Sequence, residues 1–65
     1  MQGTVKFFDS TRGFGFIVRE KGEDLFVHFS NLHPTANGDL ADGQAVEFEI
    51  GTGRRGDEAR NVRPI

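Results

Sequence analysis

Aromatic rings alternate with small or aliphatic residues in two short segments of the sequence. Phe14 and Phe16 flank a glycine, and Phe26 and His28 flank Val27. Side chains alternate between the two faces of a strand, so the two rings of each segment share a face. Exposed rings can stack on nucleobases for about 1–3 kcal/mol per base, while lysine and arginine follow the phosphates. The spacing therefore indicates a surface that stacks bases.

Phenylalanine is more often buried in a core than exposed, so burial of these rings is the alternative to be weighed. Facing the rings inward would expel Ile17, Leu25 and Val27 together, because a shift of one residue flips every side chain of a strand. A small barrel cannot hold both sets. Polar side chains that belong near water flank the ring set: Lys6, Arg12 and His28. Exposed apolar patches usually mark binding sites, so we expect the rings on the surface.

Strands must position these rings, and strand signals dominate the chain. Runs of β-prone or alternating residues, separated by glycine-rich or polar turns, cover residues 4–8, 14–19, 25–29, 45–50 and 58–62. Residues 31–44 lack an apolar stripe long enough for a helix, although one helical turn can form near 31–33. Five short strands without a helix predict an all-β protein, a small closed or nearly closed barrel with few exposed edges.

The interior of this barrel is expected to be thin. Phe7 and Phe8 are adjacent and cannot both face inward without a bulge, and Phe29, at a strand end, can face either way. The residues expected to form the core are Val5, Ile17, Leu25, Val27, Leu32, Leu40, Val46, Phe48, Ile50 and Val62. A core of this size makes a 65-residue domain marginally stable.

Length and composition restrict the class of protein. A chain of 65 residues predicts a single domain over residues 1–65, and the absence of cysteine excludes a disulfide. Two histidines without a thiol match no zinc-site spacing, so we expect no metal and no cofactor. Neither a membrane-spanning run of about 18–20 apolar residues nor a signal peptide is recognisable. We expect a cytoplasmic monomer that does not bind membranes.

Charge is distributed unevenly, although the formal net charge is only −2. Residues 1–19 sum to +2, residues 20–38 to −2, residues 39–53 to −4 and residues 54–65 to +2. If the two basic ends meet in the fold, they form a basic patch despite the acidic total. The alternative is ordinary solvated charge, and the pattern alone does not decide between them.

Two motifs and their flanks resemble a known family. Residues 12–17 (Arg-Gly-Phe-Gly-Phe-Ile) and 25–29 (Leu-Phe-Val-His-Phe) look like the two ribonucleoprotein motifs of the bacterial cold shock proteins. The similarity continues through residues 3–8, 43–49 and 59–62, and so runs through the whole chain. RNA-recognition motif domains carry a string similar to the first motif, but they need two helices and a longer chain.

The resemblance implies a five-stranded antiparallel barrel of the OB type that binds single-stranded RNA and DNA as an RNA chaperone. It implies base stacking by Phe7, Phe14, Phe16, Phe26, His28 and Phe29. It implies backbone and edge contacts from Lys6, Arg12, Asp24 and Arg55.

Three positions depart from the family's pattern. Phe7 stands where tryptophan is usual, which makes one stacking platform smaller. Arg12 replaces the usual lysine, which keeps the charge and adds a planar group that can itself stack. Asn37 stands where a loop phenylalanine is common, and His33 and Pro34 are the nearest ring-bearing residues. We therefore expect a shorter or weaker site than the family norm.

Two other classes of protein compete with this interpretation. A protein-interaction barrel of the SH3 or Tudor type also exposes aromatic residues, but such sites favour tryptophan and tyrosine, and the sequence has neither. An enzyme would need a catalytic constellation, and no triad is recognisable among the candidates Ser10, Ser30, His28 and His33. We expect a binding protein without catalytic activity.

Overall fold

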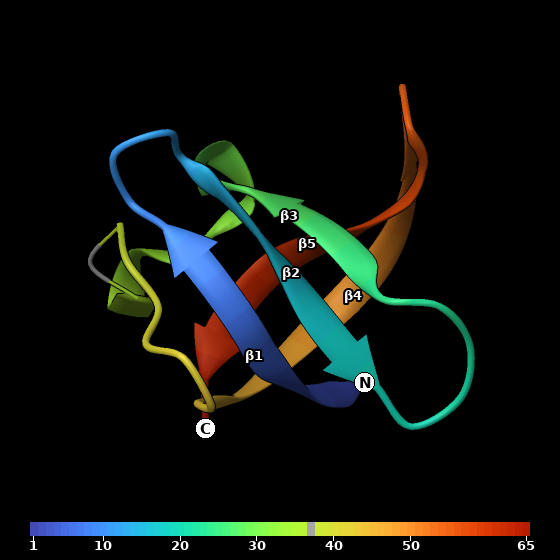
Figure 1. Ribbon diagram of the computed structural model, residues 1–65, viewed down its shortest axis with the longest axis horizontal. Coiled ribbons are helices and arrows are strands. Elements are labelled where there is room, and N and C mark those ends of the chain that lie inside the picture. The colour runs from blue at the N-terminus through green and yellow to red at the C-terminus, as the bar shows by residue number, and fades with distance from the viewer. Residues whose placement is uncertain (37) are drawn as a thin grey trace.

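The computed structural model describes residues 1–36 and 38–65. The strands are β1 (Gln2–Asp9), β2 (Phe14–Arg19), β3 (Leu25–His28), β4 (Ala45–Gly53) and β5 (Gly56–Pro64). Two short 3-10 turns, η1 (Phe29–Asn31) and η2 (Pro34–Ala36), lie between β3 and β4. The strands close into a barrel in the order β1-β2-β3-β5-β4 (Figure 1). The predicted five-stranded all-β barrel is therefore confirmed.

The strand pairing is antiparallel at four of the five contacts around the barrel. The fifth contact, between β3 and β5, is parallel at Phe26 and Glu58. A closed ring with an odd number of strands cannot alternate direction all the way round, so one pair of neighbours must run in the same direction. The antiparallel prediction is thus correct except where β3 meets β5.

A bulge in β1 separates the two adjacent phenylalanines. Val5 pairs with Ile17 and Phe7 pairs with Phe16, which leaves Lys6 without a partner in the register. The extra residue reverses the alternation of side chains along β1. Phe8 therefore lies in the core, 9% exposed, while Phe7 faces outward, 37% exposed.

The core follows the predicted faces closely. Nine of its members, eight bulky apolar side chains and one alanine, come from the strands: Val5, Phe8, Ile17, Leu25, Val27, Val46, Phe48, Ala59 and Val62. Ala36 and Leu40 complete it from the segment between β3 and β4, and Leu32 packs against it while partly buried. Phe8, Ala36 and Ala59 are core residues that the sequence did not predict.

Ile50 was predicted in the core, and that prediction is wrong. Its side chain is 37% exposed, although it pairs with the buried Ala59. β4 pairs with β1 only through residues 45–47, so by Ile50 the strand has left the closed part of the barrel. The alternation along β4 predicts the face on which Ile50 lies, but not whether other residues bury its side chain.

An ion pair joins the two longest strands. The Arg63 Nε donates to the Glu47 Oε1 at 3.0 Å, and the hydrogen bond and charge of Arg63 lower the pKa of the Glu47 carboxyl from its usual 4.5. A lowered pKa adds stability that is present above the unfolded pKa and lost as pH falls through the folded one. We expect Glu47→Gln to lower the free energy of unfolding at pH 7. Below about pH 4.5, we expect the free energy of unfolding of this variant to fall less steeply with pH than that of the wild type.

Urea unfolding of both proteins at pH 7 and at acidic pH measures this difference. Glu20→Gln, just after β2, removes the same charge and serves as the matched control. Parallel pH profiles for the wild type and Glu47→Gln would contradict the role of the pair.

Candidate nucleic-acid interface

Rings from three neighbouring strands gather on the outer side of β1, β2 and β3. The register places Phe16 opposite both Phe7 and Phe26, so these three rings form one row across the sheet. Phe14 lies opposite His28 in a second row. We use the name aromatic platform for the residues Phe7, Phe14, Phe16, Phe26, His28 and Phe29. All six are at least partly exposed, as predicted for the two motifs.

The rings of the platform pack against one another. Phe16 is central, with its ring centroid 5.6 Å from that of Phe7, 6.5 Å from that of Phe14 and 5.9 Å from that of Phe26. Phe14 and Phe26 lie 5.9 Å apart with planes only 21° from parallel. These separations fall in the range of favourable aromatic pairs, about 4.5–7 Å. The surface is therefore an array of mutually packed rings rather than isolated side chains.

Two glycines of β2 and its preceding turn make this arrangement fit. A Cβ on Gly15 would lie 2.7 Å from the Cα of Phe8, so glycine lets β1 and β2 approach closely beneath the rings. Gly13 has a φ of +80°, and a Cβ there would lie 2.7 Å from the Cδ1 of Phe29. The Phe29 amide donates to the Gly13 carbonyl at 2.8 Å. The lack of a side chain at Gly13 therefore lets the ring of Phe29 pack against the β1–β2 turn.

Phe29 and His28 form the far end of the platform. Their ring centroids are 4.6 Å apart, and Phe29 is 56% exposed because the chain turns into η1 there. The Ser30 amide donates to the Nδ1 of His28 at 3.3 Å. A nitrogen that accepts an amide proton carries none itself, so the neutral ring holds its proton on Nε2. His28 therefore presents Nε2 as a donor.

The predicted charged residues lie along the edges of the platform, and each already has a partner. The Lys6 Nζ is 3.2 Å from the Asp24 Oδ2, and the Arg12 Nε is 3.8 Å from the Asp9 Oδ2. The guanidinium carbon of Arg55 lies 5.0 Å from the centroid of Phe26. Lys6 and Arg55 come from the two basic ends of the chain, and each borders a ring-bearing strand of the platform, Lys6 beside Asp24 and Arg55 over Phe26.

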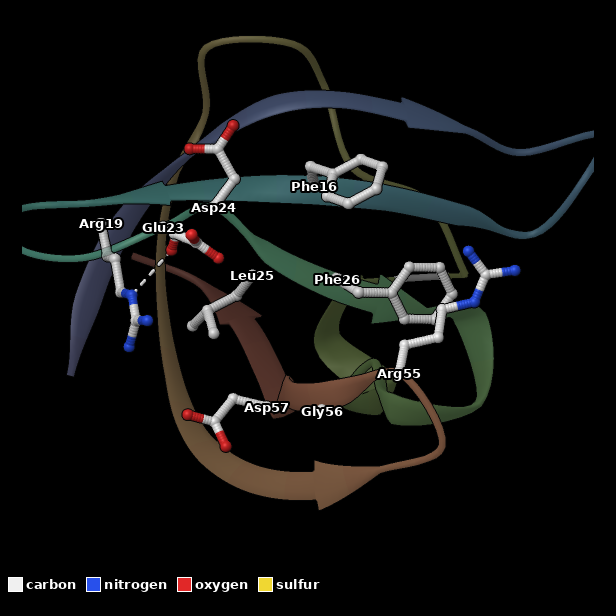
Figure 2. Close-up of a pocket in the computed structure, with 9 residues that line it drawn as sticks. All are labelled: Phe16, Arg19, Glu23, Asp24, Leu25, Phe26, Arg55, Gly56 and Asp57. Atoms are coloured by element: carbon white, nitrogen blue, oxygen red, sulfur yellow. Dashed lines mark hydrogen bonds between the residues drawn. The ribbon is translucent and has the colours of Figure 1, made fainter.

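A hollow of about 320 Å³ adjoins the platform between Phe16, Phe26 and the residues after β2. Figure 2 shows Arg19 and the carboxylates of Glu23, Asp24 and Asp57 toward one end of this hollow, and Arg55 with Phe26 toward the other. The edges of the platform therefore carry charges of both signs, with three carboxylates and Arg19 lining this hollow beside Arg55. Of the ten residues predicted for the site, six form the platform, Lys6, Asp24 and Arg55 lie beside it, and Arg12 lies in the β1–β2 turn with Asp9.

Comparison with known proteins gives the family. The 'Cold-shock' DNA-binding domain matches residues 1–65. The chain belongs to the cold-shock domain family. It is 53% identical over 62 residues to the cold shock-like protein CspC of Bacillus cereus, covering 95% of each chain. It is 52% identical over 61 residues to the cold shock protein CspA of Staphylococcus aureus, covering 94% of this chain and 92% of that one.

A more distant relative extends the match to the full chain. The cold shock-like protein of Thermotoga maritima is 45% identical over 65 residues, covering 100% of this chain and 98% of that one. The cold-shock domain is a nucleic-acid-binding family and not a family of enzymes, which favours the binding interpretation over an SH3- or Tudor-type barrel. Among the described residues, none of the helical segments is long and apolar enough to span a bilayer.

The structure describes only part of the loop in which a phenylalanine is common in this family. Asn37, which the resemblance predicts to stand where a loop phenylalanine is common, lies outside the described residues. His33 is tied elsewhere, since its Nδ1 accepts from the Thr35 amide at 3.2 Å and its own amide donates to the Val62 carbonyl at 2.7 Å. The ring contacts found within residues 1–36 and 38–65 do not join His33 to the platform.

The sequence did not predict several partnerships of this cold-shock domain. Three contacts depend on the strand register: Phe29 with Gly13, Lys6 with Asp24, and Arg55 with Phe26. The signal available in the sequence was the spacing of glycines and rings, which assigns faces but not contacts.

Proposed function

We propose that this chain binds single-stranded RNA and DNA by stacking unpaired bases on the aromatic platform. The observation that carries the proposal is that the rings gather on one side of the barrel while a separate set of side chains fills the core. The rings are therefore not needed to fill the interior. Apolar rings left together at a surface are best explained by a ligand that covers them.

Phosphates would be held at the edges of the platform by Lys6, Arg12 and Arg55. The Lys6–Asp24 and Arg12–Asp9 pairs are exposed, and exposed ion pairs contribute only about 0–1 kcal/mol. A phosphate can therefore replace either carboxylate at little cost. Asp24, once released, can accept a hydrogen bond from the edge of a base stacked on Phe16 or Phe26, which line the same hollow.

This mechanism distinguishes open strands from duplexes. A base within a duplex has both faces covered by its neighbours, so only an unpaired base can lie flat on a ring. The protein would then act as an RNA chaperone, because binding to the open form pulls a folded RNA toward that form by mass action. A stacking surface does not distinguish RNA from DNA unless it contacts the 2′-hydroxyl, so we expect both to bind.

The acting unit that we propose is a single cold-shock domain over residues 1–65, a monomer in the cytoplasm. The family match over residues 1–65 and relatives of nearly the same length support one domain. A monomer suffices because one chain supplies every residue of the platform and its margins.

Fluorescence anisotropy of a labelled oligonucleotide tests the binding proposal. The probe is an oligothymidine of about eight nucleotides, within the site size of OB folds, and the control is a duplex of equal length. We expect the single strand to bind at least about ten-fold more tightly, which is the contribution of roughly one stacked base. Equal affinity for strand and duplex would overturn the proposal.

The chaperone proposal has its own experiment. An RNA hairpin carrying a fluorophore and a quencher at its ends should open as protein is added, without ATP. Phe16→Ala should open it far less at the same concentration. A hairpin that stays closed at saturating protein would contradict chaperone activity while leaving strand binding intact.

Arg55→Ala should weaken strand binding and reduce its dependence on salt. Each neutralised phosphate of a single strand contributes about 0.7 to the slope of log K against log salt. We therefore expect the slope to fall by about that amount. Anisotropy titrations between low and physiological salt measure it. An unchanged slope would place Arg55 outside the phosphate path.

A further inference from the structure

A second hollow lies beside the platform, and the stacking mechanism does not use most of it. It encloses about 590 Å³ between η1 and the hairpin that joins β4 to β5. Its walls are Phe26, His28, Ser30, Asn31, Arg54, Arg55 and Glu58. We call this hollow the hairpin groove. Phe26 and His28 belong to both the platform and the groove, so a strand lying on the platform can continue into the groove.

The hairpin places two arginines together at this groove. Gly53 pairs with Gly56, so Arg54 and Arg55 are the two residues of the turn. Arg55 lies over the ring of Phe26, as described above. Arg54 is exposed, and the ion pairs found within residues 1–36 and 38–65 do not include it. Its guanidinium is therefore available to a ligand without first losing a carboxylate.

The single carboxylate of the groove is already neutralised. The Glu58 Oε1 accepts from the Arg60 Nη2 at 3.1 Å and from its Nε at 3.3 Å. The charge of the groove is thus set by Arg54 and Arg55, and it is positive. The hollow described above, which shares Phe26 and Arg55 with this groove, has three further carboxylates, those of Glu23, Asp24 and Asp57, besides Arg19.

The remaining walls supply hydrogen-bond donors. Asn31 brings a side-chain amide, and His28 brings its Nε2 proton, since Nδ1 is occupied by Ser30. A positive groove with neutral donors fits the oxygens of a phosphodiester, which offer only acceptors. It does not fit a further stacked base as well, because its rings are only those at the border with the platform.

We propose that the hairpin groove binds one phosphate of a nucleic-acid strand beyond the stacked bases, with Arg54 as its main contact. This inference rests on the proposed function, because the strand reaches the groove from the platform. The groove then sets the length of strand that is bound and the direction in which it leaves the platform.

Anisotropy titrations with oligothymidines of increasing length, from about four to about ten nucleotides, test this inference on the wild type and on Arg54→Gln. Lys21→Gln, between β2 and β3, removes the same charge away from the groove and is the control. We expect the variants and the wild type to bind the shortest strand alike. We expect Arg54→Gln to lose about two- to five-fold in affinity for the longer strands, the size of one exposed ion pair.

Methylphosphonate substitution, which removes the charge of one linkage, locates the contact. At one linkage of the long strand it should weaken the wild type and Lys21→Gln, and weaken Arg54→Gln clearly less. A loss in Arg54→Gln that is the same at every length, equals that of Lys21→Gln or is absent would overturn the inference. If the wild type binds no strand more tightly than duplex, the proposed function itself fails, so the two failures are distinguishable.

Discussion

Phe26→Ala is expected to lower the affinity for a single-stranded oligonucleotide at least about ten-fold while the protein stays folded. Stacking contributes about 1–3 kcal/mol per base, and Phe26 also packs against Phe14 and Phe16 and supports Arg55. Its side chain is partly exposed, so the truncation opens no cavity in the core. Anisotropy titrations measure the affinity, and urea unfolding measures the stability of the same preparation.

The neighbouring Val27 provides the matched control for this experiment. Val27 is fully buried on the opposite face of β3, so Val27→Ala should lower the stability and leave the affinity of the folded protein nearly unchanged. Phe26→Ala should show the reverse. Equal losses of stability in both variants would mean that the two faces of β3 are assigned wrongly.

Ile17→Ala is expected to have the largest effect on stability. Ile17 is completely buried, and truncation of a buried isoleucine to alanine costs about 2–5 kcal/mol. A core of this size rarely supplies more than about 3–5 kcal/mol in total. We therefore expect a protein that is largely unfolded at room temperature, as measured by circular dichroism and urea titration.

A milder variant keeps the prediction measurable if Ile17→Ala does not fold. Ile17→Val removes one methyl group and should cost about 0.5–1.5 kcal/mol. Phe16→Ala, one residue away on the outer face, should cost the fold less than Ile17→Ala and bind strands more weakly. An Ile17→Val protein as stable as the wild type would contradict the placement of Ile17 at the centre of the core.

The sequence was most informative where the strands are regular. In β2 and β3 the alternation runs without interruption, so it placed Phe14, Phe16, Phe26 and His28 outside and Ile17, Leu25 and Val27 inside. This works because the side-chain period of a strand is two, and because only one of the two sets fits the interior of a small barrel.

Sequence reasoning was weaker wherever the backbone departs from that period. The bulge at Lys6 buries Phe8 beside Val5, and a second irregularity in β5 buries both Ala59 and Val62. Asn61, with a φ of 52°, lies at this second irregularity. A bulge depends on how one strand meets its partner, so neighbours in sequence do not reveal it.

The contacts of the site could not be predicted for a related reason. The spacing of residues indicated that rings and cations would occur on one side, but not which would touch. The pair of Lys6 with Asp24 joins positions 18 residues apart, and the pair of Arg55 with Phe26 joins β3 to the hairpin. The first follows from the pairing of β1 and β3 on either side of β2, and the second from closure of the barrel, which brings β3 against β5.

The most direct test of the account uses the phenylalanines themselves. All seven aromatic residues other than histidine are phenylalanine, so labelling phenylalanine with 13C reports on both the platform and the core in one NMR spectrum. Addition of an oligothymidine should shift the ring signals of Phe7, Phe14, Phe16, Phe26 and Phe29 through the ring currents of stacked bases. The signals of the buried Phe8 and Phe48 should stay nearly unchanged. Saturated binding that leaves the platform rings unshifted would contradict the central claim that these rings stack the bases.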